Sequence, residues 1–325
     1  MKVFLLGKIR NITGWLEGCA LGLRMAGHEV RIGVTRNPAL SPTLDRALVS
    51  PRFGRPRTVG LVRAIRRFSP DLILSVLSHT LPRDLIEVIA AMPDRPPLVG
   101  WVGDVFGEAD RGMAELFDLI AYTDTAMVGL HRKLGFRTPC IFLPHAANPR
   151  LARRAPRPKP PEHRMVFVAN PTGRRRALLQ KVRSPIRVFG PGWDRGAGWD
   201  RDGGVGHEVI ARRIGAEEVG RIYASHFATL NVRNEANVLS GLNQRSFDPC
   251  LFGAAVVSDD QPDLGLCFDV GREAFAYRTA EGLDDLYGRL LAAPHEARAV
   301  GEAGRRRVLA EHTYGHRLDA LARQI

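Results

Sequence analysis

Short apolar runs alternate with helical patterns along the first half of the chain. Lys2–Gly7 (KVFLLG) predicts a buried strand, and positions 16, 19, 20 and 23 then place apolar side chains on one helix face. The cycle repeats, and it predicts strands at Glu29–Thr35, Asp71–Val76, Leu98–Val102, Leu119–Tyr122 and Cys140–Leu143, with helices near 61–68, 81–91 and 125–134. Strands separated by helices of this length predict a parallel, doubly wound sheet.

The composition changes at residues 149–163 (PRLARRAPRPKPPEH), where Pro and Arg dominate and no hydrophobic period remains. Such a stretch predicts a semi-extended linker. A solvated hinge is the simpler interpretation of its charge, and a basic contact with phosphate or lipid is the alternative. We therefore expect an N-terminal Rossmann-like domain over 1–148 and a C-terminal one over 164–325.

A second α/β cycle follows this linker. It predicts strands at Met165–Ala169, Ile186–Gly190, Phe227–Asn231 and Ala254–Ser258, and an amphipathic helix around 283–291. Two doubly wound domains joined by one linker are expected to face each other across a cleft, with the carboxyl ends of both sheets turned toward it. Chemistry is expected in that cleft.

Length and charge narrow the class of protein. A chain of 325 residues with 45% hydrophobic and 25% charged residues suits two folded domains. Its 47 Lys and Arg exceed its 34 Asp and Glu, which leaves a net charge of +13. This excess favours an anionic partner: a phosphorylated substrate, nucleic acid or an acidic membrane face.

The cysteines and the apolar runs indicate the cellular compartment in which the protein is expected. Cys19, Cys140, Cys250 and Cys267 form no C-x-x-C pair, so neither a zinc site nor a disulfide framework is expected, and reduced thiols are typical of the cytosol. The first apolar run meets Lys8 too early for a signal peptide, and no run approaches the ~18 residues that cross a bilayer. We expect a cytoplasmic protein, with peripheral contact at the inner face of an anionic membrane as a variant.

A glycine-rich segment, Gly190–Gly206 (GPGWDRGAGWDRDGGVG), follows a predicted strand. Gly190 would let the backbone approach a pyrophosphate, but no helix opens directly afterwards, as a dinucleotide-binding turn requires. Trp193 would stack on a ligand base or belong to the core. Asp200-x-Asp202 has the arrangement by which some sugar transferases hold a metal; because such triplets are common, we interpret it as surface loop and expect no metal site.

Two polar residues follow strands of the first domain. His79 comes after the strand ending at Val76, and Asp104 after the strand ending at Val102. At strand ends near a cleft, either side chain is a candidate general base for an acceptor hydroxyl. The alternatives are that Asp104 caps a turn and that His79 is an ordinary loop residue.

The second domain holds the strongest constellation. Asn231 closes a strand, and Asn243-Gln244-Arg245-Ser246-Phe247-Asp248 leads into an apolar run. Arg245 and Ser246 near a helix N-terminus can hold a diphosphate, and Asp248 can accept hydrogen bonds from ribose hydroxyls. Arg174, in the triplet that opens the helix after the first strand of this domain, would neutralise the same phosphates.

These pieces resemble glycosyltransferases of the GT-B fold, of the CgeB-like, spore-maturation-protein type with a glycosyl transferase family 1 C-terminal domain. The matching segments cover most of residues 164–320: MVFVANPTGRRR (165–176), IRVFGPGW (186–193), IYASHFATLN (222–231), GLNQRSFDPCLFG (241–253), FDVGREAFAY (268–277) and GRRRVLAEHTYGHR (304–317). The first half of the chain resembles the N-terminal domains of these glycosyltransferases more loosely. The matching pieces are Gly14, residues 26–30, WVGD (101–104) and LPHAANP (143–149).

The resemblance implies sugar transfer from a nucleoside-diphosphate sugar, bound by the C-terminal domain, to a hydroxyl of a glycan, lipid-linked or protein acceptor bound by the N-terminal one. It further implies that the C-terminal helix packs back toward the N-terminal domain and that no tightly bound cofactor or metal is needed, since helix dipoles and cations neutralise the leaving diphosphate. Asp248 takes the place of the usual ribose-binding Glu, and Ser240 stands where related enzymes often carry a second Glu. The implied donor-binding set is Arg174, Gly190, Trp193, Asn231, Asn243, Arg245, Ser246 and Asp248.

The reaction's stereochemistry and a second class of function stay open. If the reaction inverts configuration, Asp104 is the first candidate for the acceptor base and His79 the second; if it retains configuration, Asp104 only orients the acceptor. The alternative is a non-catalytic, basic nucleic-acid-binding protein on a degenerate GT-B scaffold, which the charge favours. No aromatic-plus-basic strand pattern or recognition helix supports it, so we expect no nucleic-acid partner.

Overall fold

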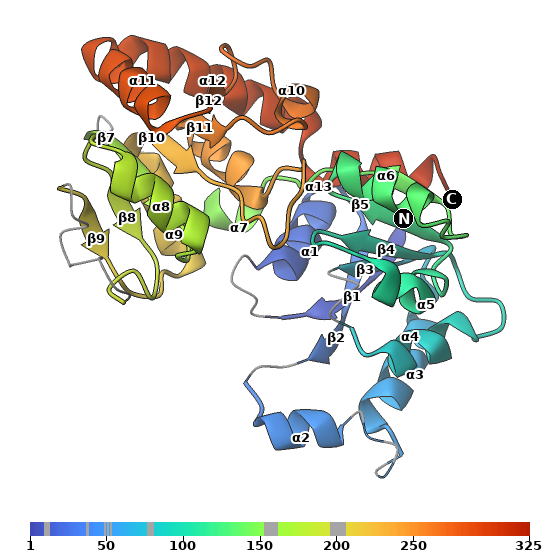
Figure 1. Ribbon diagram of the computed structural model, residues 1–325. Coiled ribbons are helices and arrows are strands. Elements are labelled where there is room, and N and C mark those ends of the chain that lie inside the picture. The colour runs from blue at the N-terminus through green and yellow to red at the C-terminus, as the bar shows by residue number, and fades with distance from the viewer. Residues whose placement is uncertain are drawn as a thin grey trace. The chain divides into compact units, whose positions relative to one another are not determined.

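The computed structural model describes residues 1–9, 14–36, 39–48, 50, 52, 54–76, 81–152, 162–195 and 206–325. The chain divides into two compact units. Unit 1 is Met1–Pro144 together with Tyr314–Ile325, and unit 2 is His145–Thr313. Each unit carries one six-stranded, all-parallel sheet flanked by helices (Figure 1). The predicted fold class, two doubly wound α/β units, is therefore confirmed.

The sheet of unit 1 has the strand order β2-β1-β3-β4-β5-β6. Its strands are β1 (Lys2–Lys8), β2 (Glu29–Arg36), β3 (Leu72–Val76), β4 (Leu98–Val102), β5 (Leu119–Tyr122) and β6 (Cys140–Phe142). Every residue of β3, β4 and β5 is buried, because helices cover both faces of a parallel sheet. This explains why these strands are continuous apolar runs in the sequence.

The helices of unit 1 include one from the far end of the chain. They are α1 (Trp15–Met25), α2 (Pro42–Ala47), α3 (Pro56–Phe68), α4 (Arg83–Ala90), the 3-10 turn η3 (Glu108–Asp110), α5 (Arg111–Ala114), α6 (Thr125–Lys133) and α13 (Tyr314–Ala322). Tyr314 of α13 lies edge-on to Trp101, with ring centroids 6.0 Å apart. It also packs against Gly22 of α1, where a Cβ atom would lie only 2.7 Å from the tyrosine ring.

The sheet of unit 2 has the order β12-β11-β10-β7-β8-β9. Its strands are β7 (Glu162–Val168), β8 (Arg187–Phe189), β9 (Glu208–Ile210), β10 (His226–Asn231), β11 (Ala255–Asp259) and β12 (Phe275–Tyr277). The chain runs outward from β7 to β9 and then returns to place β10 on the other side of β7. The strand order therefore reverses between β7 and β10.

The helices of unit 2 are α7 (Pro149–Ala152), α8 (Gly173–Lys181), α9 (Ala216–Ser225), α10 (Leu264–Cys267), α11 (Ala280–Ala292) and α12 (Pro294–Glu311), with 3-10 turns η4 (Gln244–Ser246) and η5 (Asp248–Phe252). The core of this unit contains Phe167 of the sheet, Leu283 of α11 and Trp193 of the turn after β8, each fully buried. None of the helices in the described ranges is both long and apolar enough to span a bilayer.

The segment predicted as a linker, residues 149–163, has described residues only at its ends. Residues 149–152 form α7, and β7 begins at Glu162. Residues 153–161 lie outside the described part of the chain. The linker and the domain boundaries based on it therefore stay predictions.

Candidate functional site

A polar cluster lies at the carboxyl ends of β7, β10 and β11. The strand order reverses between β7 and β10, so the loops that follow these strands leave in opposite directions, and open α/β sheets bind ligands at such points. The loop after β7 leads directly into α8. Thr172 caps this helix, because its hydroxyl accepts the backbone N–H of Arg175 at 3.4 Å. The free N–H groups and positive end of the helix dipole thus lie beside the reversal.

Arg175 joins the two loops across this reversal. Its Nε and Nη2 donate to the carbonyl oxygen of Val232 after β10, at 3.1 and 3.0 Å. Its Nη1 donates to the carbonyl of Asn170 after β7, at 2.9 Å. The side chain is 3% exposed, and burial, together with the nearby guanidinium of Arg245, lowers its pKa to about 9. It still carries its positive charge at neutral pH.

Asn231, the last residue of β10, is the centre of a hydrogen-bond network. Its Nδ2 donates to Ser246 Oγ at 2.9 Å and to Ser258 Oγ at 3.2 Å, and its Oδ1 accepts from Asn243 Nδ2 at 3.1 Å. Asn243 in turn accepts the backbone N–H of Arg245 at 2.9 Å and so caps η4. The structure therefore brings four sequence-predicted residues together, and it shows that Asn231 and Asn243 hold η4 in place.

The carboxylate of Asp259, at the end of β11, contacts two arginines, Arg174 and Arg233. One carboxylate oxygen accepts the backbone N–H of Arg233 at 3.2 Å and Gln261 Nε2 at 2.8 Å. The other lies 3.5 Å from Arg174 Nη2. Burial raises the pKa of Asp259, although these hydrogen bonds partly offset the effect. Arg174 is also paired with Glu235 on the loop after β10.

Arg245 contributes a donor that is left without a protein partner. Among the described residues, its Nε is a buried nitrogen with no hydrogen bond, and Gln261, which donates to Asp259, has a buried Oε1 in the same state. Burial lowers the pKa of Arg245, because no carboxylate pairs with it closely enough to compensate. Buried polar atoms are almost always hydrogen-bonded, so an unbonded donor within this cluster is the kind of group that a ligand would satisfy.

Gly190 and Trp193 pack against the loop after β7 at the carbonyl oxygen of Ala169. Gly190 has φ +148°, and a Cβ atom there would lie 2.1 Å from the carbonyl oxygen of Ala169. Trp193 is fully buried, and its indole N–H donates to that same oxygen at 2.6 Å. Their position shapes the loop that leads into α8, whose first turn contains Arg174. The buried ring of Trp193 offers no face for a ligand base.

Asp248 lies inside unit 2. Its side chain is 7% exposed, and one carboxylate oxygen accepts the backbone N–H of Asn148 at 2.8 Å. Burial raises its pKa to about 7, against the opposing effects of this hydrogen bond and of Arg245. Ribose binding by Asp248 stays a prediction, and the structure adds that this carboxyl holds the segment entering α7.

Of the remaining candidates, only Asp104 is among the described residues. Asp104 follows β4 in unit 1 and is half-buried. His79, Asp200 and Asp202 lie outside the described residues. In the ranges that the structure describes, no group of three or more His, Cys, Asp or Glu side chains is placed to hold a metal ion. The roles assigned to Asp104 and His79 therefore remain predictions.

Sequence reasoning missed Asp259 and Gln261. Both follow the predicted strand that ends at Ser258, in the run Ser-Asp-Asp-Gln. A polar residue at the end of a buried strand, or just after it, was the signal that selected Asn231 and Asp104, and the same signal was available here. The arrangement as a whole is a cluster of arginines and amides around two buried carboxyl groups, those of Asp248 and Asp259.

Comparison with known proteins relates the second half of the chain to one sequence family. Residues 174–323 match the sequence model of a family described as glycosyl transferase-like. The second half of the chain is therefore similar to this family, and the CgeB-like subtype stays a prediction. No curated protein matches the chain in sequence.

Solved structures extend the likeness to the whole chain. Anabaena Alr3699/HepE in complex with UDP and glucose aligns with a TM-score of 0.68 and 12% identity over 100% of this chain and 99% of its own. Sucrose-phosphate synthase from Thermosynechococcus elongatus gives 0.65 and 13% over 100% and 98%. AviGT4, a glycosyltransferase involved in avilamycin A biosynthesis, gives 0.63 and 15% over 100% and 96%. At these identities the likeness establishes the fold, and the chain has the GT-B architecture.

Proposed function

We propose that this protein is a glycosyltransferase that takes a sugar from a nucleoside-diphosphate sugar, and that the diphosphate binds at the reversal of the sheet in unit 2. The observation that carries the proposal is the unpartnered, buried Nε of Arg245 beside the buried guanidinium of Arg175. Two cations in a weakly polar setting favour an anion between them, and a fork-shaped guanidinium suits phosphate oxygens. The N-terminus of α8 adds to the same field.

The proposed chemistry follows from charge. As the bond between sugar and diphosphate breaks, negative charge grows on the leaving diphosphate, and fixed cations and backbone N–H groups stabilise it without reorganising. Arg245, Arg174 and the first turn of α8 supply these groups, so the proposed reaction uses no metal. Arg175 acts as a positioning residue, because its hydrogen bonds are spent on the two loops.

The acceptor side of the proposal is a hydroxyl of a glycan, a lipid-linked or a protein acceptor, bound by unit 1. Asp104 is the proposed acceptor base in an inverting reaction. A neighbour crystallised with UDP and glucose supports a uridine nucleotide and a hexose as the first donor to test.

The donor site is tested by nucleotide binding. Thermal unfolding is followed with UDP, GDP, dTDP, CDP, ADP and uridine; a native-state ligand at ~100 times its Kd adds about 2.7 kcal/mol of stability. We expect one diphosphate to stabilise the protein and the free nucleoside to do so much less. In Arg245→Gln the Kd for that diphosphate should rise about 10-fold to 100-fold, as expected for a lost charge-assisted hydrogen bond.

The matched control is Arg213→Gln, which removes an exposed arginine of the same unit outside the cluster. It should bind the diphosphate like the wild type. Unchanged binding in Arg245→Gln would overturn the assignment of the site. If no nucleotide raises the melting temperature of the wild type but a short oligonucleotide does, the result would instead favour the nucleic-acid-binding alternative.

A further inference from the structure

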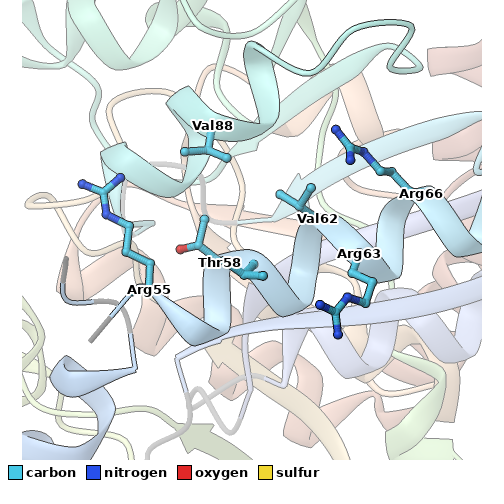
Figure 2. Close-up of a pocket in the computed structure, with 8 residues that line it drawn as sticks. Arg55, Thr58, Val62, Arg63, Arg66 and Val88 are labelled. Atoms are coloured by element: carbon cyan, nitrogen blue, oxygen red, sulfur yellow. The ribbon is translucent and has the colours of Figure 1, made fainter. Parts of the chain in front are cut away.

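Unit 1 carries a second basic surface, on the side of α3 next to α4. A groove of about 560 Å³ lies here, and we call it the α3–α4 groove. It is lined by Gly54, Arg55, Thr58, Val59, Val62, Arg63, Arg66 and Val88. Figure 2 shows Val88 of α4 opposite Thr58 and Val62 of α3, with Arg55 and Arg66 at the two ends of this row. Residues 59, 62, 63 and 66 are three or four apart, so they share one side of the helix.

The charge of this region has one sign. Between residues 46 and 67 the chain has seven arginines and no acidic residue. Asp84 lies 3.6 Å from Arg55, and Asp45 pairs with Arg57 at 2.7 Å. Within the described residues, no carboxylate pairs with Arg63 or Arg66, and both side chains are exposed. The groove thus presents uncompensated positive charge to its surroundings.

Aliphatic side chains lie among these arginines. Val59 is 50% exposed on the same side of α3. The lining side chains include three valines but no aromatic ring and no amide. Proteins that bind single-stranded nucleic acid stack bases on aromatic rings, whereas membrane-surface helices combine basic residues for lipid headgroups with aliphatic ones for the acyl boundary. The groove has the composition of a membrane-surface helix, basic and aliphatic without aromatic rings.

We propose that the α3–α4 groove binds the headgroups of an anionic lipid bilayer, with Arg63 and Arg66 on the lipid phosphates and Val59 at the acyl boundary. The groove shares no residue with the cluster in unit 2. The proposal therefore stands or falls independently of the donor site.

The test is sedimentation of the full chain with vesicles of phosphatidylcholine alone or with about one third phosphatidylglycerol. We expect the wild type to bind only the anionic vesicles, and less at high salt. Arg63→Glu with Arg66→Glu should weaken partitioning by at least about 25-fold, since each arginine near an anionic surface contributes roughly five-fold. Val59→Ser should weaken it by a smaller factor. All three positions are exposed, so the fold is expected to persist, and circular dichroism checks this.

The control carries the same charge change elsewhere: Arg306→Glu with Arg323→Glu, two exposed positions outside the groove. It should partition within a few-fold of the wild type. The proposal is overturned if the wild type ignores anionic vesicles, if the control loses as much binding as the groove variant, or if the groove variant loses affinity for a short oligonucleotide while keeping its affinity for vesicles.

Discussion

The buried carboxyl group of Asp248 makes the stability of unit 2 depend on pH. Burial raises its pKa from about 3.8 to about 7, so the folded protein holds this proton more tightly than the unfolded chain does. The stabilising effect is fully present below the unfolded pKa and is lost as the pH rises toward 7. At about 1.4 kcal/mol per pH unit, the loss amounts to a few kcal/mol.

Replacing Asp248 by Asn should remove that dependence. The amide keeps an oxygen for the backbone N–H of Asn148 and carries no charge to desolvate. Urea unfolding at pH 5 and pH 8 should show a smaller fall in the free energy of unfolding for Asp248→Asn than for the wild type. Equal falls in the two proteins would contradict the assigned pKa. A raised Kd for the diphosphate in this variant would support the ribose contact as well.

At the scale of elements, one close approach decides how α12 packs. Gly301 faces the chain between η5 and β11, and a Cβ atom there would lie 2.0 Å from the carbonyl oxygen of Gly253. Backbone atoms cannot give way as a flexible side chain can. The helix therefore rests directly on the backbone at the start of β11, the strand that ends in Asp259.

Gly301→Ala should destabilise the protein by about 2–3 kcal/mol, because overpacking outweighs the gain of up to ~1 kcal/mol from a better helix former. The control is Gly288→Ala on α11, where no atom lies within 4 Å of the added methyl group. That change should be neutral or stabilising by up to about 1 kcal/mol. Chemical denaturation of the two variants measures the difference, and similar values for both would refute the close contact.

Strands buried on both faces were predicted from the sequence to within a residue or two, because continuous apolar runs such as 98–102 have few other interpretations. Of the three-residue strands, β6 and β8 were predicted and β9 and β12 were not, because runs so short show no period that separates a strand from a loop. In the site, Arg245 and Ser246 were found from their neighbours along the chain. The clamp made by Arg175 and the buried position of Trp193 depend on contacts between distant segments, which no local pattern encodes.

At the scale of the molecule, unit 1 is built from two separated stretches of chain. α13 belongs to unit 1, and its Tyr314 covers Trp101 and the surface of α1 at Gly22. The whole of unit 2 lies between these stretches in the sequence. The hydrophobic core of unit 1 is therefore closed by residues that come after unit 2.

Ending the chain at Thr313 should destabilise unit 1 selectively. Removing Tyr314 and Leu318, both 1% exposed, uncovers apolar surface worth several kcal/mol at about 25 cal/mol per Å². Tryptophan fluorescence of Trp15 and Trp101, read in a variant with the other tryptophans replaced by Phe, should report unfolding at a lower urea concentration. The diphosphate should still bind, because its proposed site uses unit 2 alone. Loss of nucleotide binding with an intact unit 1 would contradict this division.

The same topology sets an order of synthesis within unit 1. Trp101 and α1 are translated before unit 2, whereas α13, whose Tyr314 packs on them, is translated after it. A nascent chain halted before Tyr314 would therefore lack the side chains that cover this apolar surface in the folded protein.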